Sequence, residues 1–132
     1  MLYSATMSEE SLVLEIRIFT VHPGTRPEFD RISREGTVPL MRRLGINVVT
    51  HGPSLNNDDG YYLLRAFRSE DDRVTLSQSL YTTEEWETTY DAPVTAMIAD
   101  YRTAVITTTA ELVEQLKREA GRKEEVTRGS SP

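Results

Sequence analysis

The sequence EIRIFTVHPG at residues 15–24 is typical of a β-strand that runs into a turn at Pro23 and Gly24. Successive side chains of a strand point to opposite faces. One face of this strand is wholly apolar and consists of Leu12, Leu14, Ile16 and Ile18. The other face is mixed and consists of Val13, Glu15, Arg17 and Phe19. Opposite charges on an otherwise apolar strand indicate either a pair inside an enclosed site or a surface pair on a half-solvated strand.

The length and composition of the chain limit how it can enclose a binding site. The chain has 132 residues, of which 38% are hydrophobic, and this is enough for the core of one domain. A domain of this size has little interior to spare, so a cavity competes with the core. We therefore expect two chains to enclose a binding cavity together.

Charge and residue content exclude several classes of partner. The net charge is −6 and no run is rich in Lys or Arg, so neither nucleic acid nor an anionic membrane is expected. No apolar stretch approaches the roughly 18 residues that span a bilayer, and no basic segment followed by an apolar run opens the chain. The expected location is cytoplasmic. The absence of cysteine excludes disulfides, thiol catalysis and thiolate metal sites.

The segment after the first strand has the signals of a helix. Thr25 and Glu28 have the spacing of a capping box, and Pro27 suits the first turn. Pro39 lies inside the helical pattern, where its missing N–H should kink the last turns. Gly45 is a suitable end for the helix.

Three further strands are predicted from β-branched and aromatic residues at 46–51, 61–68 and 101–108. The turn-forming residues at 52–60 join the first two of them in a hairpin. Helices are predicted between about 70 and 99 and from 109 to 120. They begin at three capping boxes, Ser69 with Asp72, Thr82 with Glu85, and Thr108 with Glu111.

This order of elements predicts an α+β fold of the ferredoxin-like type, a four-stranded antiparallel sheet with helices on one face. The open face would be apolar, with Val13, Phe19, Val49 and Leu64 among its residues. Such a face favours association with a second copy, so we expect a homodimer. The predicted parts of the chain are a disordered leader at 1–10, the folded domain at 11–109, a helix at 110–120 and a disordered tail at 121–132.

The opening strand resembles the E-x-R-x-(Tyr/Phe)-T-x-x-P-G motif of the NIPSNAP family, with matches at Glu15, Arg17, Pro23 and Gly24. Weaker similarity continues in TVPL at 37–40, YLLR at 62–65 and EEW at 84–86, so the resemblance spans roughly residues 12–108. It implies a dimeric α+β barrel in which the mixed face of the first strand lines an enclosed cavity. The terminal helix lies outside the resemblance.

The candidate catalytic residues are Glu15, Arg17 and His51. Glu15 and Arg17 lie two apart on one strand face, about 7 Å between Cα atoms, which is close enough to pair. In an enclosed site they would offer a guanidinium for an anionic or enolic substrate and a carboxylate of adjustable pKa. In a structural role they satisfy one another or the partner subunit. His51 suits general acid–base catalysis near neutral pH, or it is a hydrogen-bonded residue at a strand end.

The candidate substrate-binding residues are Phe19, Tyr62, Arg65 and Trp86. Trp86 also suits a purely structural role between helix and sheet. Tyr61 and Tyr62 point to opposite faces of their strand, and the pattern does not say which of them faces the helices.

Neither a metal nor a cofactor is predicted. His22 and His51 have no metal-binding spacing, and Asp58 and Asp59 lack the spaced oxygen ligands of a calcium loop. The chain contains no Gly-rich phosphate loop and no dinucleotide-binding fingerprint.

The resemblance extends to function. Dimeric α+β barrels include enzymes of secondary metabolism that catalyse cofactor-free oxygenation, cyclisation, isomerisation or decarboxylation. The first hypothesis is therefore a cofactor-independent monooxygenase, cyclase or isomerase that acts on an apolar aromatic or polyketide-like small molecule. The alternative is a non-catalytic binding or scaffold protein of NIPSNAP type that uses the same dimer. Both rest on analogy of fold.

Overall fold

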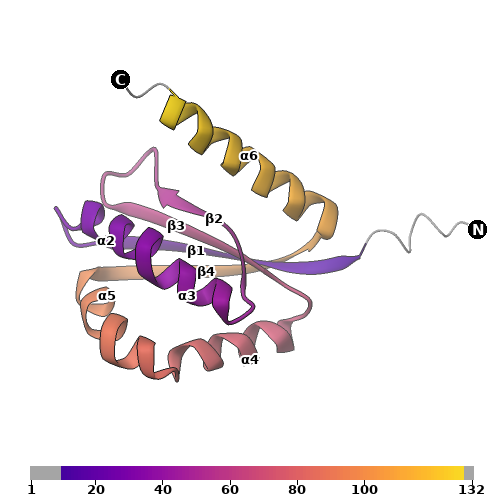
Figure 1. The fold of residues 1–132 in the computed structure, drawn as a ribbon, viewed down its shortest axis with the longest axis horizontal. Coiled ribbons are helices and arrows are strands. Elements are labelled where there is room, and N and C mark those ends of the chain that lie inside the picture. Colours follow the sequence, from indigo (N-terminus) through magenta and orange to yellow (C-terminus); the bar gives the residue numbers. More distant parts are fainter. Residues whose placement is uncertain (1–9, 130–132) are drawn as a thin grey trace, which may run out of the picture.

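The computed structural model describes residues 10–129, which form an α+β fold of the predicted ferredoxin-like type (Figure 1). The strands form one antiparallel four-stranded sheet in the order β2-β3-β1-β4. Their bounds are β1 (Ser11–Val21), β2 (Asn47–Pro53), β3 (Gly60–Phe67) and β4 (Ile98–Thr109). Strand β4 begins before residue 101 and ends after residue 108, the two predicted ends. The predicted leader lies outside the described residues, except for residue 10.

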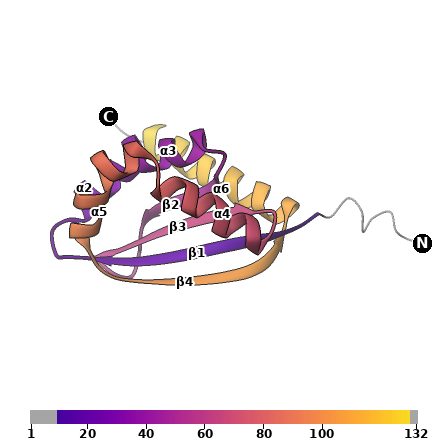
Figure 2. The ribbon, with the colours of Figure 1, turned by 90° about the horizontal axis from the view of Figure 1, so that it is seen from below.

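Two helical segments cover one side of the sheet (Figure 2). The first consists of α2 (Arg26–Ile32), the π-helical turn η1 (Ser33–Thr37) and α3 (Val38–Arg43). The second consists of α4 (Glu70–Tyr81), the π-helical turn η2 (Trp86–Tyr90) and α5 (Asp91–Met97). In the described part of the chain, no helix has both the length and the apolar character needed to cross a membrane.

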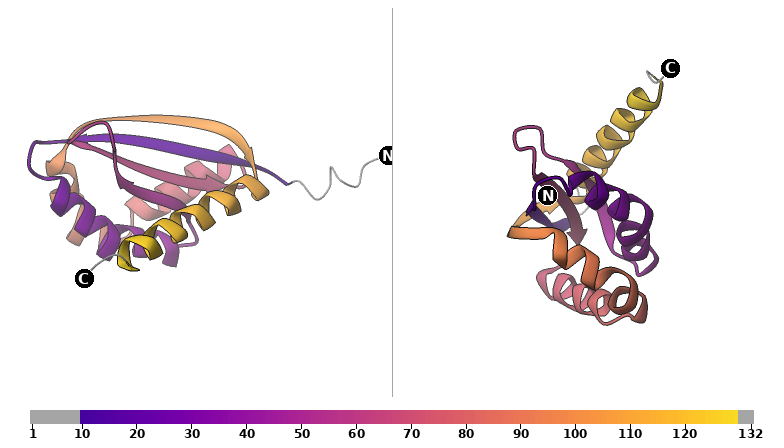
Figure 3. Two further views of the ribbon diagram at one scale, coloured as in Figure 1. Left: turned by 90° about the horizontal axis from the view of Figure 1, so that it is seen from above. Right: turned by 90° about the vertical axis from the view of Figure 1, so that its left-hand side faces the viewer.

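The last helix, α6 (Ala110–Gly129), packs on the other side of the sheet and continues past residue 120, where the sequence predicted its end. Its buried Val113 joins Leu14, Val49 and Ala66 in a small apolar cluster, and Lys117 Nζ donates to Asn47 Oδ1 at 3.0 Å. The right-hand view of Figure 3 shows α6 running away from the sheet in a different direction from α4 and α5. The helix therefore covers only one part of the outer face.

The mixed face of β1 points toward the helices, which corrects part of the predicted open face. Phe19 lies in the main core with Tyr61, its partner in the β1–β3 register, and Val13 packs against the same core. Val49 and Leu64 do lie on the outer face, beside the apolar face of β1. The prediction was wrong for Val13 and Phe19. They lie on the same face of β1 as Glu15 and Arg17, and this face meets the helices.

Three of the four predicted helix N-caps form a side-chain cap, two of them one residue later than predicted. The backbone N–H of Asp72 donates to Ser69 Oγ at 3.0 Å, as predicted for α4. The next two caps are Thr83 and Thr109, each one residue later than predicted, and they accept N–H bonds at 3.1 and 3.2 Å. Thr25 does not cap α2, because its hydroxyl donates to the carbonyl of His22 at 2.7 Å.

A π-helical turn, rather than a simple kink, precedes Pro39. The backbone N–H of Val38 donates to the carbonyl of Ser33, which is the five-residue spacing of a π-helix. Pro39 has no N–H to give to the carbonyl four residues earlier, so the helix loses an α-helical bond at this point. Gly45, with φ of +87°, then ends the segment as predicted.

A buried ion pair joins β1 to β3, and it is not the predicted Glu15–Arg17 pair. Arg65 lies opposite Glu15 in the register and donates to both carboxylate oxygens at 2.7 and 3.0 Å. Both side chains are 1% exposed. Arg73 of α4 donates to Glu15 Oε2 at 2.9 Å, and Arg65 also donates to Ser77 Oγ at 3.2 Å. The network therefore fastens α4 to the sheet.

The electrostatics of this network set the titration of Glu15. Burial acts to raise the pKa of Glu15. The hydrogen bonds and charge of Arg65, followed by the hydrogen bond from Arg73 and the charge of Arg17, outweigh burial and hold the pKa below its usual value. A lowered folded-state pKa means that the charged carboxylate stabilises the fold.

We predict that Glu15→Gln lowers the free energy of unfolding by about 3–5 kcal/mol at neutral pH, because it leaves the buried Arg65 guanidinium without its counter-charge. Urea denaturation measures the loss. Glu28→Gln is the matched control, because Glu28 forms an exposed pair with Arg31, and it should leave the unfolding midpoint unchanged. Equal midpoints for the two variants would contradict the assigned role of the buried pair.

The same variant has a predicted pH dependence. The stabilisation by Glu15 is fully present above the unfolded-state pKa of about 4.3 and is lost as the pH falls through the lower folded-state pKa. The difference in stability between the wild-type protein and Glu15→Gln should therefore shrink below about pH 4. Urea denaturation from pH 3 to pH 7 tests this, and a difference that stays constant in acid would contradict it.

Candidate functional site

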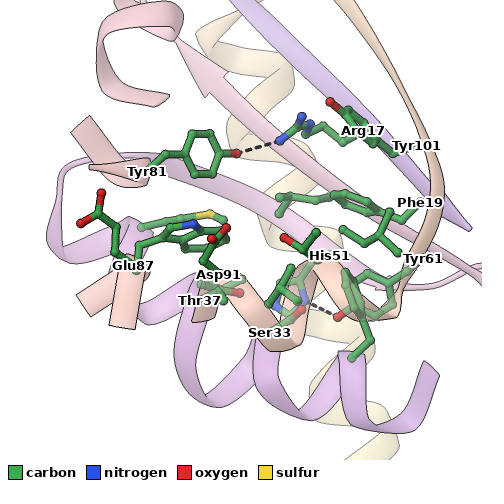
Figure 4. Close-up of a pocket in the computed structure, with 18 residues that line it drawn as sticks. Arg17, Phe19, Ser33, Thr37, His51, Tyr61, Tyr81, Glu87, Asp91 and Tyr101 are labelled. Carbon is green, nitrogen blue, oxygen red and sulfur yellow. Dashed lines mark hydrogen bonds between the residues drawn. The ribbon is translucent and has the colours of Figure 1, made fainter. Parts of the chain in front are cut away.

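A cavity of about 390 Å³ lies between the sheet and the helices of a single chain (Figure 4). The sheet wall carries Arg17, Phe19, His51 and Tyr101, and the helix wall carries Ser33, Thr37, Tyr81, Trp86 and Asp91. We expected two chains to enclose a cavity, whereas one chain supplies all of the described lining. Both helical segments, α2–η1–α3 and α4–η2–α5, contribute to this lining together with the sheet.

Arg17 extends from the middle of β1 into the cavity wall. Its Nη1 donates to the hydroxyl of Tyr81 at 2.9 Å, and its Nε donates to Thr103 Oγ1 at 3.4 Å (Figure 4). Its guanidinium carbon lies 5.0 Å from the ring centroid of Tyr101 and 5.8 Å from that of Phe19. The guanidinium is thus held by a hydroxyl and two rings, and no carboxylate is in an ion pair with it among the described residues.

His51, Tyr61 and Asp30 form a chain of hydrogen bonds at another side of the cavity. The hydroxyl of Tyr61 donates to Asp30 Oδ1 at 2.7 Å, and His51 Nδ1 lies 2.8 Å from the same hydroxyl oxygen. A carboxylate can only accept hydrogen bonds, so Tyr61 uses its single hydroxyl hydrogen to donate to Asp30. His51 Nδ1 must then be the donor to Tyr61. In a neutral ring this assigns the lone pair to Nε2.

Tyr61 remains protonated at ordinary pH. Burial raises the pKa of its hydroxyl, and the hydrogen bond to Asp30 and the negative charge of Asp30 raise it further. Ser33 and Arg34 act in the opposite direction and do not overcome these effects. Tyr61 therefore serves as a fixed hydrogen-bonding link between Asp30 and His51.

The structure brings four of the predicted site residues to the cavity and leaves three outside it. Arg17, Phe19, His51 and Trp86 line the cavity. Glu15 and Arg65 lie in the buried network described above and are not among the lining residues. Tyr62 pairs with Ile18 and so points to the outer face, which settles the choice between the two tyrosines in favour of Tyr61.

Sequence reasoning missed several lining residues. Tyr61 could have been found from the register, because it lies opposite Phe19. Tyr81 gave no signal, because it is the last residue of α4 and its partner Arg17 is 64 positions away. Ser33 and Thr37 were not among the predicted site residues, although Thr37 belongs to the TVPL segment of the family resemblance.

Among residues 10–122, whose side chains the structure describes, no group of three or more His, Cys, Asp or Glu could hold a metal ion. The cavity offers instead one cation, hydroxyl groups, a histidine and aromatic rings. These groups suit hydrogen bonding, ring stacking and the binding of an anion.

Comparison with known proteins was made by sequence and by structure. No family profile matches the sequence, and the search of curated proteins finds no match. Among solved structures, a NIPSNAP family protein from Agrobacterium tumefaciens is 18% identical, with a TM-score of 0.68 over 75% of this chain and 87% of that one. A NIPSNAP-like domain protein from Burkholderia xenovorans is 16% identical, with a TM-score of 0.65 over 72% and 83%.

SnoaB, described as a cofactor-independent oxygenase from Streptomyces nogalater, is 17% identical, with a TM-score of 0.54 over 74% of this chain and 92% of that one. Likeness at these identities shows the fold. It confirms that the chain has the same α+β fold as these NIPSNAP proteins, as the opening motif indicated.

We predict that Tyr61→Phe changes the tautomer of neutral His51. In the wild-type protein the ring carries its proton on Nδ1, because Tyr61 accepts there. Without the hydroxyl, Nδ1 loses this acceptor, so the share of the Nδ1–H form should fall. Ring ¹⁵N chemical shifts above neutral pH distinguish the two forms. An unchanged Nδ1–H form in the variant, or an Nε2–H form in the wild-type protein, would contradict the hydrogen-bond assignment.

Proposed function

We propose that the cavity is the substrate site of a cofactor-independent enzyme of secondary metabolism that acts on an apolar aromatic or polyketide-like molecule. The observation that carries this proposal is the Arg17 guanidinium, held in an aromatic wall with no carboxylate in an ion pair with it among the described residues. A cation in this position would complement an anionic or enolic oxygen on a flat ligand.

The cavity has the size and surface that such a ligand needs. Its volume of about 390 Å³ lies within the range of small-molecule sites, which are mostly apolar with a few placed polar groups. Phe19 and Tyr101 flank Arg17 on the sheet wall, and Trp86 stands on the helix wall. An aromatic ring between these walls would bring its charged oxygen to Arg17.

His51 is the proposed proton-transfer residue. Oxygenation, cyclisation, isomerisation and decarboxylation of phenolic or enolic substrates all pass through an electron-rich anion. Arg17 would stabilise the oxygen of that anion, and His51 Nε2 would take or return the proton. Asp30 and Tyr61 would fix the tautomer that leaves Nε2 basic.

The fold likeness to SnoaB supports an enzyme, because that protein is described as a cofactor-independent oxygenase. The alternative function, a non-catalytic small-molecule binding or scaffold protein, uses the same cavity without proton transfer. The two differ in one observable, which is whether a bound molecule is converted.

The homodimer is part of the proposal and rests on the outer face of the sheet. Ile18 of β1 and Ile106 of β4 are 47% and 46% exposed there, beside the partly buried Ile16 and Leu64. α6 covers only the other part of this face. Large apolar side chains exposed together on a sheet favour association, and a second copy offers the same self-complementary surface.

We predict that Arg17→Met abolishes the binding of anionic aromatic compounds and lowers the thermal midpoint only slightly, because the buried Glu15 keeps its partners Arg65 and Arg73. Calorimetric titration with 2-hydroxy-1,4-naphthoquinone, an acidic enol, measures the binding. Arg68→Met, at an exposed arginine outside the cavity, is the control. Undiminished binding by Arg17→Met would contradict the proposed role of the guanidinium.

We predict that His51→Asn reduces turnover near neutral pH while leaving ligand affinity mostly intact, as expected for a proton-transfer residue. The assay is oxygen uptake and product analysis with a panel of hydroxylated naphthalenes and anthracenes, and the exposed His22→Asn is the control. Full activity in His51→Asn would contradict its role. Binding by the wild-type protein without conversion of any compound would favour the alternative function.

We predict that the protein is a dimer and that Ile18→Asp converts it to a monomer, because a charge on the outer face cannot be buried against a second copy. Sedimentation at low micromolar concentration measures the state. Val74→Asp is the matched control, since Val74 is similarly exposed but lies on α4, on the helix side. A wild-type monomer at this concentration, or an Ile18→Asp dimer, would contradict the proposed interface.

A further inference from the structure

The helix wall of the cavity is built partly from the two π-helical turns. η1 contributes Ser33 and Thr37, and η2 contributes Trp86 and Glu87. The turns meet at Gly36, where an added Cβ would lie 2.5 Å from ring atoms of Tyr90. Only a glycine permits this approach, so the backbone of η1 packs directly on a ring of η2. π-Helical turns are frequent at functional sites, because they re-aim side chains that an α-helix would place elsewhere.

Thr37 is the residue of η1 whose polar group has no local partner. Thr37 lines the cavity and is 6% exposed, and its hydroxyl has no hydrogen-bond partner among residues 10–122, whose side chains the structure describes. A helical threonine commonly donates to the carbonyl four residues earlier. The hydroxyl of Thr37 makes no such bond to the carbonyl of Ser33, which accepts the backbone N–H of Val38. A buried hydroxyl without a partner is unfavourable, and a ligand oxygen in the cavity would satisfy it.

The charges around Thr37 restrict what that oxygen can be. Glu87 and Asp91 line the same helix wall, so a second anionic group on the ligand would meet like charge there. A neutral carbonyl oxygen avoids this repulsion and can accept a hydrogen bond from the hydroxyl of Thr37. The cation Arg17 belongs to the opposite, sheet wall. Figure 4 shows Arg17 and Thr37 on different elements across the cavity.

We infer that Thr37 is a specificity-determining residue that donates its hydroxyl to a neutral carbonyl of the ligand, while Arg17 binds an anionic oxygen of the same molecule. The inference rests on the proposed function of this cavity and narrows its ligand class. The ligand is a flat aromatic molecule with an acidic enol or phenol and a separate carbonyl, as in hydroxyquinones.

Thr37→Val tests the inference because it removes the hydroxyl and keeps the side-chain volume. The probes are 2-hydroxy-1,4-naphthoquinone, which has both oxygens, and naphthalene-2-carboxylate, which has the anion alone. Thr37→Val should weaken binding of the quinone by about tenfold and leave binding of the carboxylate unchanged. Thr37→Ser should bind both probes as the wild-type protein does. Arg17→Met should abolish the binding of both.

A stability measurement accompanies the titrations. The thermal midpoint of ligand-free Thr37→Val should equal or exceed that of the wild-type protein, because the lost hydroxyl had no partner to lose. Thr108→Val is the matched control, since Thr108 is a buried threonine that lies outside the cavity, and it should bind both probes normally. A midpoint for Thr37→Val that is lower by several degrees would overturn the inference.

The outcomes separate this inference from the proposed function. If the quinone binds Thr37→Val as tightly as it binds the wild-type protein, while Arg17→Met still abolishes its binding, the role of Thr37 is overturned and the cavity remains the ligand site. If neither probe binds the wild-type protein, the proposed function is overturned and the inference with it.

Discussion

The buried Glu15–Arg65 pair is the interaction on which the rest of the structure depends. It joins the two central strands, and through Arg73 and Ser77 it fixes α4 over the sheet. The last residue of α4 is Tyr81, whose hydroxyl holds the Arg17 guanidinium in the cavity wall. A buried pair is not by itself strongly stabilising, but losing one partner is costly. The pair therefore acts as a constraint that determines where α4, and with it one wall of the cavity, can lie.

The cavity is the second feature that distinguishes this structure. A chain of 132 residues could fill the space under its helices with apolar side chains, as small domains usually do. Here the helix wall contains two π-helical turns, and the buried Ser33 and Thr37 stand where a core would place apolar residues. Local irregularity and buried hydroxyls are features that packing alone does not favour. They make sense when the space between sheet and helices is occupied by another molecule.

The architecture could be predicted from the sequence, because the alternation of side chains along strands, the turn residues and the helix caps are all local signals. The α+β class, the four strands, the Ser69 cap and the Gly45 stop all follow from residues within a few positions of one another. Part of the candidate site also followed, since Arg17 and Phe19 lie on one face of a single strand. The family motif added the type of fold, which the structural likeness confirms.

The remaining features depend on contacts between distant residues. Glu15 pairs with Arg65 rather than Arg17, because directly opposed residues on neighbouring strands are closer than residues two apart on one strand. Both faces of β1 are rich in apolar residues, so hydrophobicity could not say which one meets the helices. Arg73 and Ser77, which hydrogen-bond to the buried Glu15–Arg65 pair, come from α4. The choice of Tyr61 over Tyr62 likewise depended on the strand register.

The central claim is that an anionic aromatic molecule binds between the sheet and the helices with its charge on Arg17. The most direct measurement is a crystal structure of the protein with 2-hydroxy-1,4-naphthoquinone. The account predicts the ring system between Phe19 and Trp86, with its enolate oxygen within hydrogen-bond distance of the Arg17 guanidinium. A molecule found on the outer face of the sheet, or in the cavity without contact to Arg17, would contradict it.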